Sequence, residues 1–216
     1  MASVIFDMDG LLVDSEGAFA LAWDWAGEKL GIGPAGFMKE KTLGASLKMT
    51  LPLWKAEFGE SFDAERFRQY SREFLAVYFR ENPMPEKPGA GDLVRYLAGR
   101  GVPMAVASSS PRWEVELHLS NLGLTDYFSA ILTGDDVTAS KPEPEIYQKA
   151  CAALGVLPKD AFALEDARNG LVSAHRAGCR VLMVPDRWQP DEEVKGFVEG
   201  MFPDLLAVKA YLEEKL

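Results

Sequence analysis

The chain has 216 residues, 48% of them hydrophobic, which suits one large domain or a core domain with a small accessory domain. Its 23 basic and 33 acidic side chains give a net charge of −10 at pH 7, so a nucleic acid or an anionic membrane surface is a poor partner. No apolar run is long enough to span a bilayer, and no basic segment precedes the first apolar run as in a secretion signal. Because Cys151 and Cys179 form no C-x-x-C pair, we expect a cytoplasmic protein with reduced thiols.

The first predicted element is a buried strand at Val4-Ile5-Phe6, a short β-branched and aromatic run. Asp7 and Asp9 follow directly, and Gly10 lets the backbone turn away. Carboxylates this close repel each other, so the pair indicates a bound cation or a shared proton. An acidic turn that caps the next helix gives the same short pattern, and the pair alone does not decide between the two.

The next segment, from residue 16 to about 79, has the periodicity of amphipathic helices throughout. One helix is predicted to end at Leu30 before Gly31, and others cover residues 43–58 and 63–79. A proline-rich linker then spans residues 81–89. We expect a small helical domain at residues 15–86, inserted after the first strand of a core domain at residues 1–14 and 87–216.

From residue 89 onward, predicted helices and strands alternate. The helices cover 90–99, 111–122, 144–154 and 169–177, and the strands cover 102–107, 130–133, 161–164 and 180–184. This alternation predicts an α/β fold with a doubly wound, Rossmann-like parallel sheet. We find no internal repeat and no low-complexity stretch.

Polar side chains follow several of these predicted strands, at the sheet edge where such folds bind ligands. Besides Asp7 and Asp9 they are Ser108, Lys141, Glu165 and Asp166. Each has a plain alternative: Ser108 as a helix N-cap, Lys141 as an exposed lysine, and the acidic pair as a favourable charge at a helix N-terminus. Their combination in this order favours a site.

Four segments carry a resemblance to a known family. DMDGLLVDSE, VASSSP, SKPEPEIY and ALEDARNG resemble, in order, the four motifs of the haloacid dehalogenase (HAD)-type phosphohydrolases. The helical insert is similar to the cap of the group that includes β-phosphoglucomutase and small sugar-phosphate phosphatases. The resemblance implies a magnesium-dependent phosphatase, a phosphoric monoester hydrolase, that acts on a small phosphorylated metabolite such as a sugar phosphate.

The same resemblance implies a role for each motif residue. Asp7 would be the nucleophile that forms an aspartyl-phosphate, and Asp9 the general acid and base. Mg²⁺ would bind Asp7, the backbone carbonyl of Asp9, and Asp166, with Glu165 acting directly or through a water. By the same resemblance, Ser108 and Lys141 would hold phosphate oxygens. We further expect Ser109 and Arg112 of the core and Gly44 and Lys48 of the insert to bind substrate, with a solvated surface position as the alternative for Lys48.

Two positions depart from β-phosphoglucomutase. Leu47 occupies the place of an arginine that binds the second phosphate of the mutase substrate, and Phe19 the place of a histidine that assists proton transfer. We therefore expect a hydrolase, with a phosphosugar mutase and a catalytically silent binding protein as alternatives. His118 and His175 lack partners at metal-ligand spacing, so we expect no metal there. A monomer or weak homodimer is expected, without nucleic-acid or membrane partners.

Overall fold

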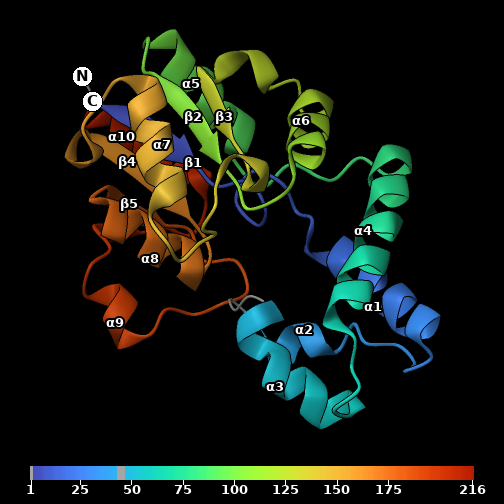
Figure 1. The fold of residues 1–216 in the computed structure, drawn as a ribbon. Coiled ribbons are helices and arrows are strands. Elements are labelled where there is room, and N and C mark those ends of the chain that lie inside the picture. Colours follow the sequence, from blue (N-terminus) through green and yellow to red (C-terminus); the bar gives the residue numbers. More distant parts are fainter. Residues whose placement is uncertain (1, 43–46) are drawn as a thin grey trace. The chain divides into compact units, whose positions relative to one another are not determined.

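The computed structural model describes residues 2–42 and 47–216 (Figure 1). It divides into two compact units, one formed by the residues up to Asp14 together with Met84–Leu216, and the other by Ser15–Pro83. The return from the smaller unit thus falls at Pro83–Met84, inside the segment 81–89 that the sequence indicates as a linker. None of the helices among the described residues has the length and apolar character needed to cross a membrane.

The larger unit is built on a parallel sheet, as the alternating pattern predicts. Among the described residues its strand order is β3-β2-β1-β4-β5-β6. The strands are β1 (Ser3–Phe6), β2 (Met104–Ala107), β3 (Ala130–Leu132), β4 (Ala161–Glu165), β5 (Arg180–Met183) and β6 (Gly200–Met201). Figure 1 shows β1 between β2 and β4, and the strand pairs with both of them in parallel. The predicted doubly wound fold is therefore confirmed.

Helices cover both faces of this sheet. The helices are α5 (Ala90–Gly99), α6 (Arg112–Asn121), α7 (Glu145–Leu154), α8 (Arg168–Ala177), α9 (Glu192–Lys195) and α10 (Leu205–Glu213), with short 3-10 turns at Thr125–Tyr127, Gly134–Asp136 and Pro158–Asp160. Val4 and Phe6 of β1 pack in the cluster that holds apolar side chains of α5, α6 and α10. Ile5 points to the other face, into the cluster with side chains of α7, α8 and α9. Burial on both faces explains why β1 reads as a continuous apolar run rather than an alternating one.

The register of the central strands brings their carboxyl ends to one level. Phe6 is paired with Val106 of β2 and with Leu164 of β4. Asp7 therefore follows β1 beside the end of β2 and the end of β4, and its backbone N–H donates to Leu164 O at 3.0 Å. This register brings the motif residues that follow β1, β2 and β4 together at one edge of the sheet.

The C-terminal part differs from the sequence-based expectation, which assigns no element after residue 184. The structure adds α9, β6 and α10 there. Asp191 is the N-cap residue of α9, and its side chain accepts a hydrogen bond from the backbone N–H of Val194 at 2.9 Å. Asp204 is the N-cap residue of α10, and its side chain accepts from the backbone N–H of Ala207 at 2.8 Å. Two cap signals were thus readable, whereas β6 has only two residues and carries no periodic pattern.

The smaller unit is helical, with α1 (Glu16–Leu30), α2 (Met38–Lys41), α3 (Leu47–Phe58) and α4 (Ala64–Glu81). Gly31 ends α1 in a left-handed conformation at φ 72°, as the sequence predicts. The start of the helix predicted at 43–58 lies outside the described residues. The fully buried Trp54 stacks on Phe62 and contacts Phe67, so aromatic packing holds this unit together.

Candidate active site

Three carboxylates meet at the carboxyl ends of β1 and β4. Oxygen atoms of Asp7, Glu165 and Asp166 all lie within 4.8 Å of one another. Gly10, with φ +81°, lets the chain turn beside them, and a Cβ at this position would lie 2.4 Å from Asp166 Oδ2. A Cβ at Gly170 would lie 1.9 Å from Glu165 Oε1. Both glycines are therefore required for the backbone to pass so close to the acidic cluster.

Lys141 is the positive charge inside this cluster. Its Nζ donates to Asp7 Oδ1 and Glu165 Oε1, both at 2.6 Å, and to Ala107 O at 2.9 Å. Only 8% of the residue is exposed, so the alternative of a solvated surface lysine is wrong. Glu145 holds the loop that leads to Lys141. The Oε2 atom of Glu145 accepts hydrogen bonds from the backbone N–H groups of Thr138 and Ala139, at 3.0 and 2.9 Å.

Burial and crowding shift the pKa values of this cluster. Burial raises the pKa of Asp7 to about 8, and the charge of Glu165 adds to the rise, while Lys141 opposes it. Burial and the neighbouring charge of Asp7 also raise the pKa of Asp166. For Lys141, burial lowers the pKa, but the charges of Asp7 and Glu165 outweigh burial and keep the ammonium ion protonated.

One lysine does not balance the charges of the buried Asp7 and Glu165 and the half-buried Asp166, and the raised pKa values of Asp7 and Asp166 are the consequence. The cluster offers several oxygen atoms within reach of one point, and carboxylate oxygens are the ligands that hard divalent cations prefer. Asp7, Glu165 and Asp166 therefore fit a divalent metal ion.

Tyr147 is a buried member of this site that the sequence analysis does not single out. Its hydroxyl donates to Glu165 Oε1, and its ring centroid lies 5.1 Å from Lys141 Nζ. Tyr147 is fully buried on α7. The signal was available, because Tyr147 closes the SKPEPEIY segment, but the sequence does not show where its hydroxyl points.

The three serines in the turn after β2 differ in their contacts and exposure. Ser110 Oγ donates to Asp9 Oδ2 at 2.7 Å, although the sequence analysis names only its two neighbours. Ser108 is fully buried and its Oγ accepts the Ser110 backbone N–H at 3.0 Å. Because α6 begins at Arg112 with Pro111 as its N-cap residue, the helix-cap alternative for Ser108 is wrong. Ser109 is exposed.

The remaining residues expected to bind substrate lie elsewhere or are not described. The Arg112 guanidinium donates to Asp136 Oδ2 at 2.7 Å and to Ile131 O at 3.2 Å, so its contacts are with the β3 side of the sheet rather than with the acidic cluster. Gly44 lies outside the described residues. Lys48 belongs to α3, but its side chain is outside the described part.

A second group of titratable side chains lies around Asp9. A carboxylate oxygen of Asp9, one of Glu114 and a ring nitrogen of His118 all lie within 4.8 Å of one another. Glu114 and His118 are 3% and 1% exposed. Burial lowers the pKa of His118, and the charge of Asp9 opposes this shift without cancelling it. The lowered pKa favours the neutral imidazole. In the sequence His118 has no partner at metal-ligand spacing, and its grouping with Asp9 and Glu114 appears only in the folded chain.

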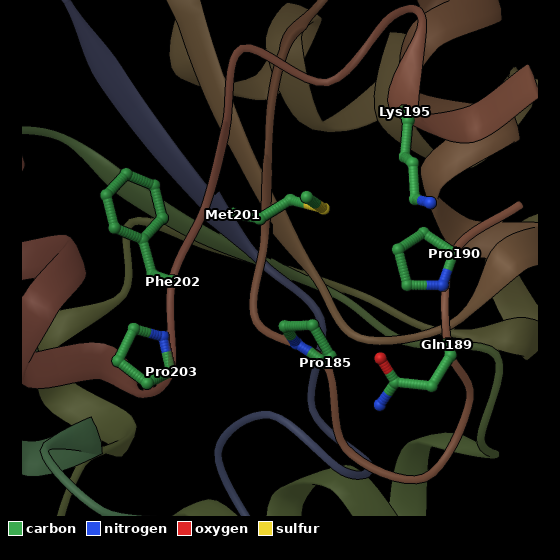
Figure 2. Close-up of a pocket in the computed structure, with 7 residues that line it drawn as sticks. All are labelled: Pro185, Gln189, Pro190, Lys195, Met201, Phe202 and Pro203. Atoms are coloured by element: carbon green, nitrogen blue, oxygen red, sulfur yellow. The ribbon is translucent and has the colours of Figure 1, made fainter. Parts of the chain in front are cut away.

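Two surface hollows are lined entirely by described residues of the larger unit. One, of about 390 Å³, contains none of the predicted site residues; its lining is Pro185, Gln189, Pro190, Lys195, Met201, Phe202 and Pro203 (Figure 2). The other, of about 220 Å³, includes Gly10 and Asp186 and so adjoins the acidic cluster. At this hollow Lys87 Nζ forms an ion pair with Asp186 Oδ1 at 2.9 Å.

Known proteins are similar to this chain in sequence and in fold. The family model of the haloacid dehalogenase-like hydrolases matches residues 1–178, most of the chain, so the chain belongs to this family. A phosphorylated carbohydrates phosphatase of Thermotoga maritima is 30% identical over 82% of both chains. Hexitol phosphatase B of Escherichia coli is 33% identical over 85% of this chain and 83% of its own.

A solved structure is also similar to this chain in fold and in sequence. The crystal structure of CbbY from Rhodobacter sphaeroides in complex with phosphate has a TM-score of 0.78 and 26% identity, covering 94% of this chain and 95% of its own. The resemblance seen in the four sequence motifs is thus confirmed. The chain is a phosphatase of the HAD family.

Proposed function

We propose that this phosphatase removes phosphate from a small phosphorylated sugar or sugar alcohol, with Mg²⁺ and through an aspartyl-phosphate on Asp7. The observation that carries the proposal is the contact of Lys141 Nζ with both Asp7 and Glu165 at 2.6 Å, next to the turn that holds Ser108. The substrate class is supported by the relatives, one named for phosphorylated carbohydrates and the other for hexitols.

Asp7 is the nucleophile in this proposal. Its carboxylate oxygen forms a bond to phosphorus while the bond from phosphorus to the sugar oxygen breaks. Lys141 holds Asp7 Oδ1 at 2.6 Å, so the attacking group keeps one orientation in a buried setting. The same ammonium ion, together with the hydroxyl of Ser108 and the turn at Ser109, would hold phosphate oxygens.

Asp9 is the proposed general acid and base. It gives a proton to the departing sugar oxygen and then takes one from the water that attacks the aspartyl-phosphate. The Ser110 hydroxyl, which donates to Asp9 Oδ2 at 2.7 Å, fixes the orientation of this carboxylate. In the second step the bond between phosphorus and Asp7 breaks, and inorganic phosphate leaves.

Asp7, Asp166 and the backbone carbonyl of Asp9 would hold Mg²⁺, and Glu165 lies close enough to contribute an oxygen directly or through a water. When bound, the ion offsets the repulsion between a dianionic phosphate and the Asp7 carboxylate.

The unit Ser15–Pro83 is the proposed cap, and Gly44 and Lys48 are its proposed substrate-selecting residues. The two chain segments that lead into and out of this unit are bonded to each other. Asp14 N–H donates to Pro85 O, and Lys87 N–H donates to Leu12 O, both at 2.9 Å. We propose that the cap moves about two hinges, at residues 13–16 and 81–87, and this pairing supports the two hinges moving together. We further propose a cytoplasmic monomer or weak homodimer.

The test is phosphate release from a panel of sugar and sugar-alcohol phosphates, with Mg²⁺ and with excess chelator. We expect release that needs the metal ion and is lost in Asp7→Asn. Lys48→Ala should change the ranking of substrates without abolishing turnover of a generic aryl phosphate. Full turnover in chelator would contradict the metal requirement, and net isomerisation of β-glucose 1-phosphate faster than phosphate release would favour the mutase alternative.

A further inference from the structure

A glutamate and a histidine are buried one helical turn apart on α6, beside the carboxylate proposed for acid–base chemistry. Glu114 is 3% exposed and His118 1% exposed. Residues four apart lie on one face of a helix. Side chains of this kind are seldom buried without a polar role, because desolvation is costly.

The packing of α6 does not itself require them. Val115 and Leu119, the residues next to each, already join the apolar cluster of the sheet face. The polar pair instead faces Asp9, since the three groups place oxygen and nitrogen atoms within 4.8 Å of one another. Asp9 Oδ2 also accepts from Ser110 Oγ at 2.7 Å, so polar groups of two elements converge on this one carboxylate.

We propose that His118 and Glu114 are positioning residues that hold the Asp9 carboxylate in the orientation needed for proton transfer. An imidazole has at least one N–H, and here a ring nitrogen lies within 4.8 Å of an oxygen of each of two carboxylates, which are hydrogen-bond acceptors. Glu114 fixes the ring, and the ring in turn fixes Asp9, together with the Ser110 hydroxyl. This inference rests on the proposed role of Asp9 as general acid and base.

The test compares two substrates whose departing oxygens differ in their need for a proton. A sugar phosphate releases a strongly basic alkoxide, whereas para-nitrophenyl phosphate releases a stabilised phenolate that needs little protonation. For His118→Leu we expect kcat/KM to fall by about 10- to 100-fold on the sugar phosphate, below the range for complete loss of an acid, and by less than about threefold on the aryl phosphate. Glu114→Gln should show the same pattern with a smaller loss.

Three controls make the comparison decisive. His118→Gln keeps an amide N–H and should recover part of the activity that His118→Leu loses. Glu116→Gln changes an exposed glutamate of the same helix and should alter neither substrate. Adding His118→Leu to Asp9→Asn should lower kcat/KM no further, because both changes remove the same function. If His118→Leu does not fold, judged by circular dichroism, Glu114→Gln and His118→Gln still carry the test.

Equal losses on both substrates, or no loss, would overturn the inference while leaving Asp9 in place. If Asp9→Asn itself lowers kcat/KM by the same factor on both substrates, the proposed role of Asp9 is wrong, and the inference fails with it. The two failures are therefore distinguishable.

Discussion

Replacing Lys141 by methionine removes the ammonium ion that contacts both Asp7 and Glu165 of the acidic cluster. Methionine keeps an unbranched apolar stem, so the packing around α7 changes little. The matched control is Lys195→Met, because Lys195 is exposed and pairs only with the exposed Glu192 at 2.8 Å among its described contacts.

The size of the effect follows from burial. Removing one partner of a buried ion pair typically costs about 3–5 kcal/mol, since it leaves uncompensated charge. In the metal-free protein Asp7 limits this cost by taking up a proton, because its pKa is already about 8 and rises further without Lys141. Each additional bound proton makes stability fall with pH by about 1.4 kcal/mol per pH unit.

An acid whose folded pKa exceeds its unfolded value binds more protons in the folded state, so stability falls as pH rises between the two values. In the wild type this window for Asp7 ends near pH 8. In Lys141→Met it extends higher, so the variant should lose about 3 kcal/mol or more at pH 9 and clearly less at pH 6.

The assay is urea unfolding in chelator at the two pH values, combined with phosphate release in Mg²⁺ at neutral pH. We expect turnover to fall by at least about 100-fold, while Lys195→Met stays within about 0.5 kcal/mol of wild type. A loss of stability as small as that of the control, without dependence on pH, and turnover within about twofold of wild type would refute the reasoning.

Three further predictions concern the same cluster. The affinity of the metal-free protein for Mg²⁺ should rise with pH up to about 8, with proton release on binding, since Asp7 must lose its proton; calorimetry in buffers of different ionisation enthalpy measures this, and a flat profile would count against it. Tyr147→Phe should lower the unfolding free energy by about 2 kcal/mol through loss of a hydrogen bond to a charged acceptor, and should reduce turnover less than Lys141→Met does; unchanged stability would argue against this bond. Gly10→Ala should weaken Mg²⁺ binding at least about tenfold by displacing Asp166, whereas Gly155→Ala, at a similar φ but with open space around it, should not; equal affinities would exclude the steric account.

Local pattern was sufficient to predict strands β1 to β5 and the edge of the sheet at which the site forms, but not β6. The apolar run before Asp7 and the strand before Ser108 predict parallel strands, and parallel strands bring their carboxyl ends together. The burial of Lys141 was not predictable, because its contacts come from Asp7, Ala107 and Glu165, which the register alone brings together.

Side-chain direction within short segments was the main thing that sequence patterns could not supply. The three serines after β2 are equivalent in sequence, and the turn in which Ser110 N–H donates to Ser108 Oγ decides which hydroxyl meets Asp9. Glu114 and His118 did carry a signal, since they follow the same spacing as Val115 and Leu119. The search for metal-ligand spacing around His118 did not consider Glu114 on the same helix face, so the pair was missed.

The central claim is that Asp7 carries the phosphoryl group during turnover. The most direct measurement is rapid quenching of a single turnover, followed by mass spectrometry of the peptide that contains Asp7 and Asp9. The account predicts a transient phosphate on Asp7 that hydroxylamine removes, that persists longer in Asp9→Asn, and that does not form in Asp7→Asn. Phosphate on another residue, or full turnover by Asp7→Asn, would contradict it.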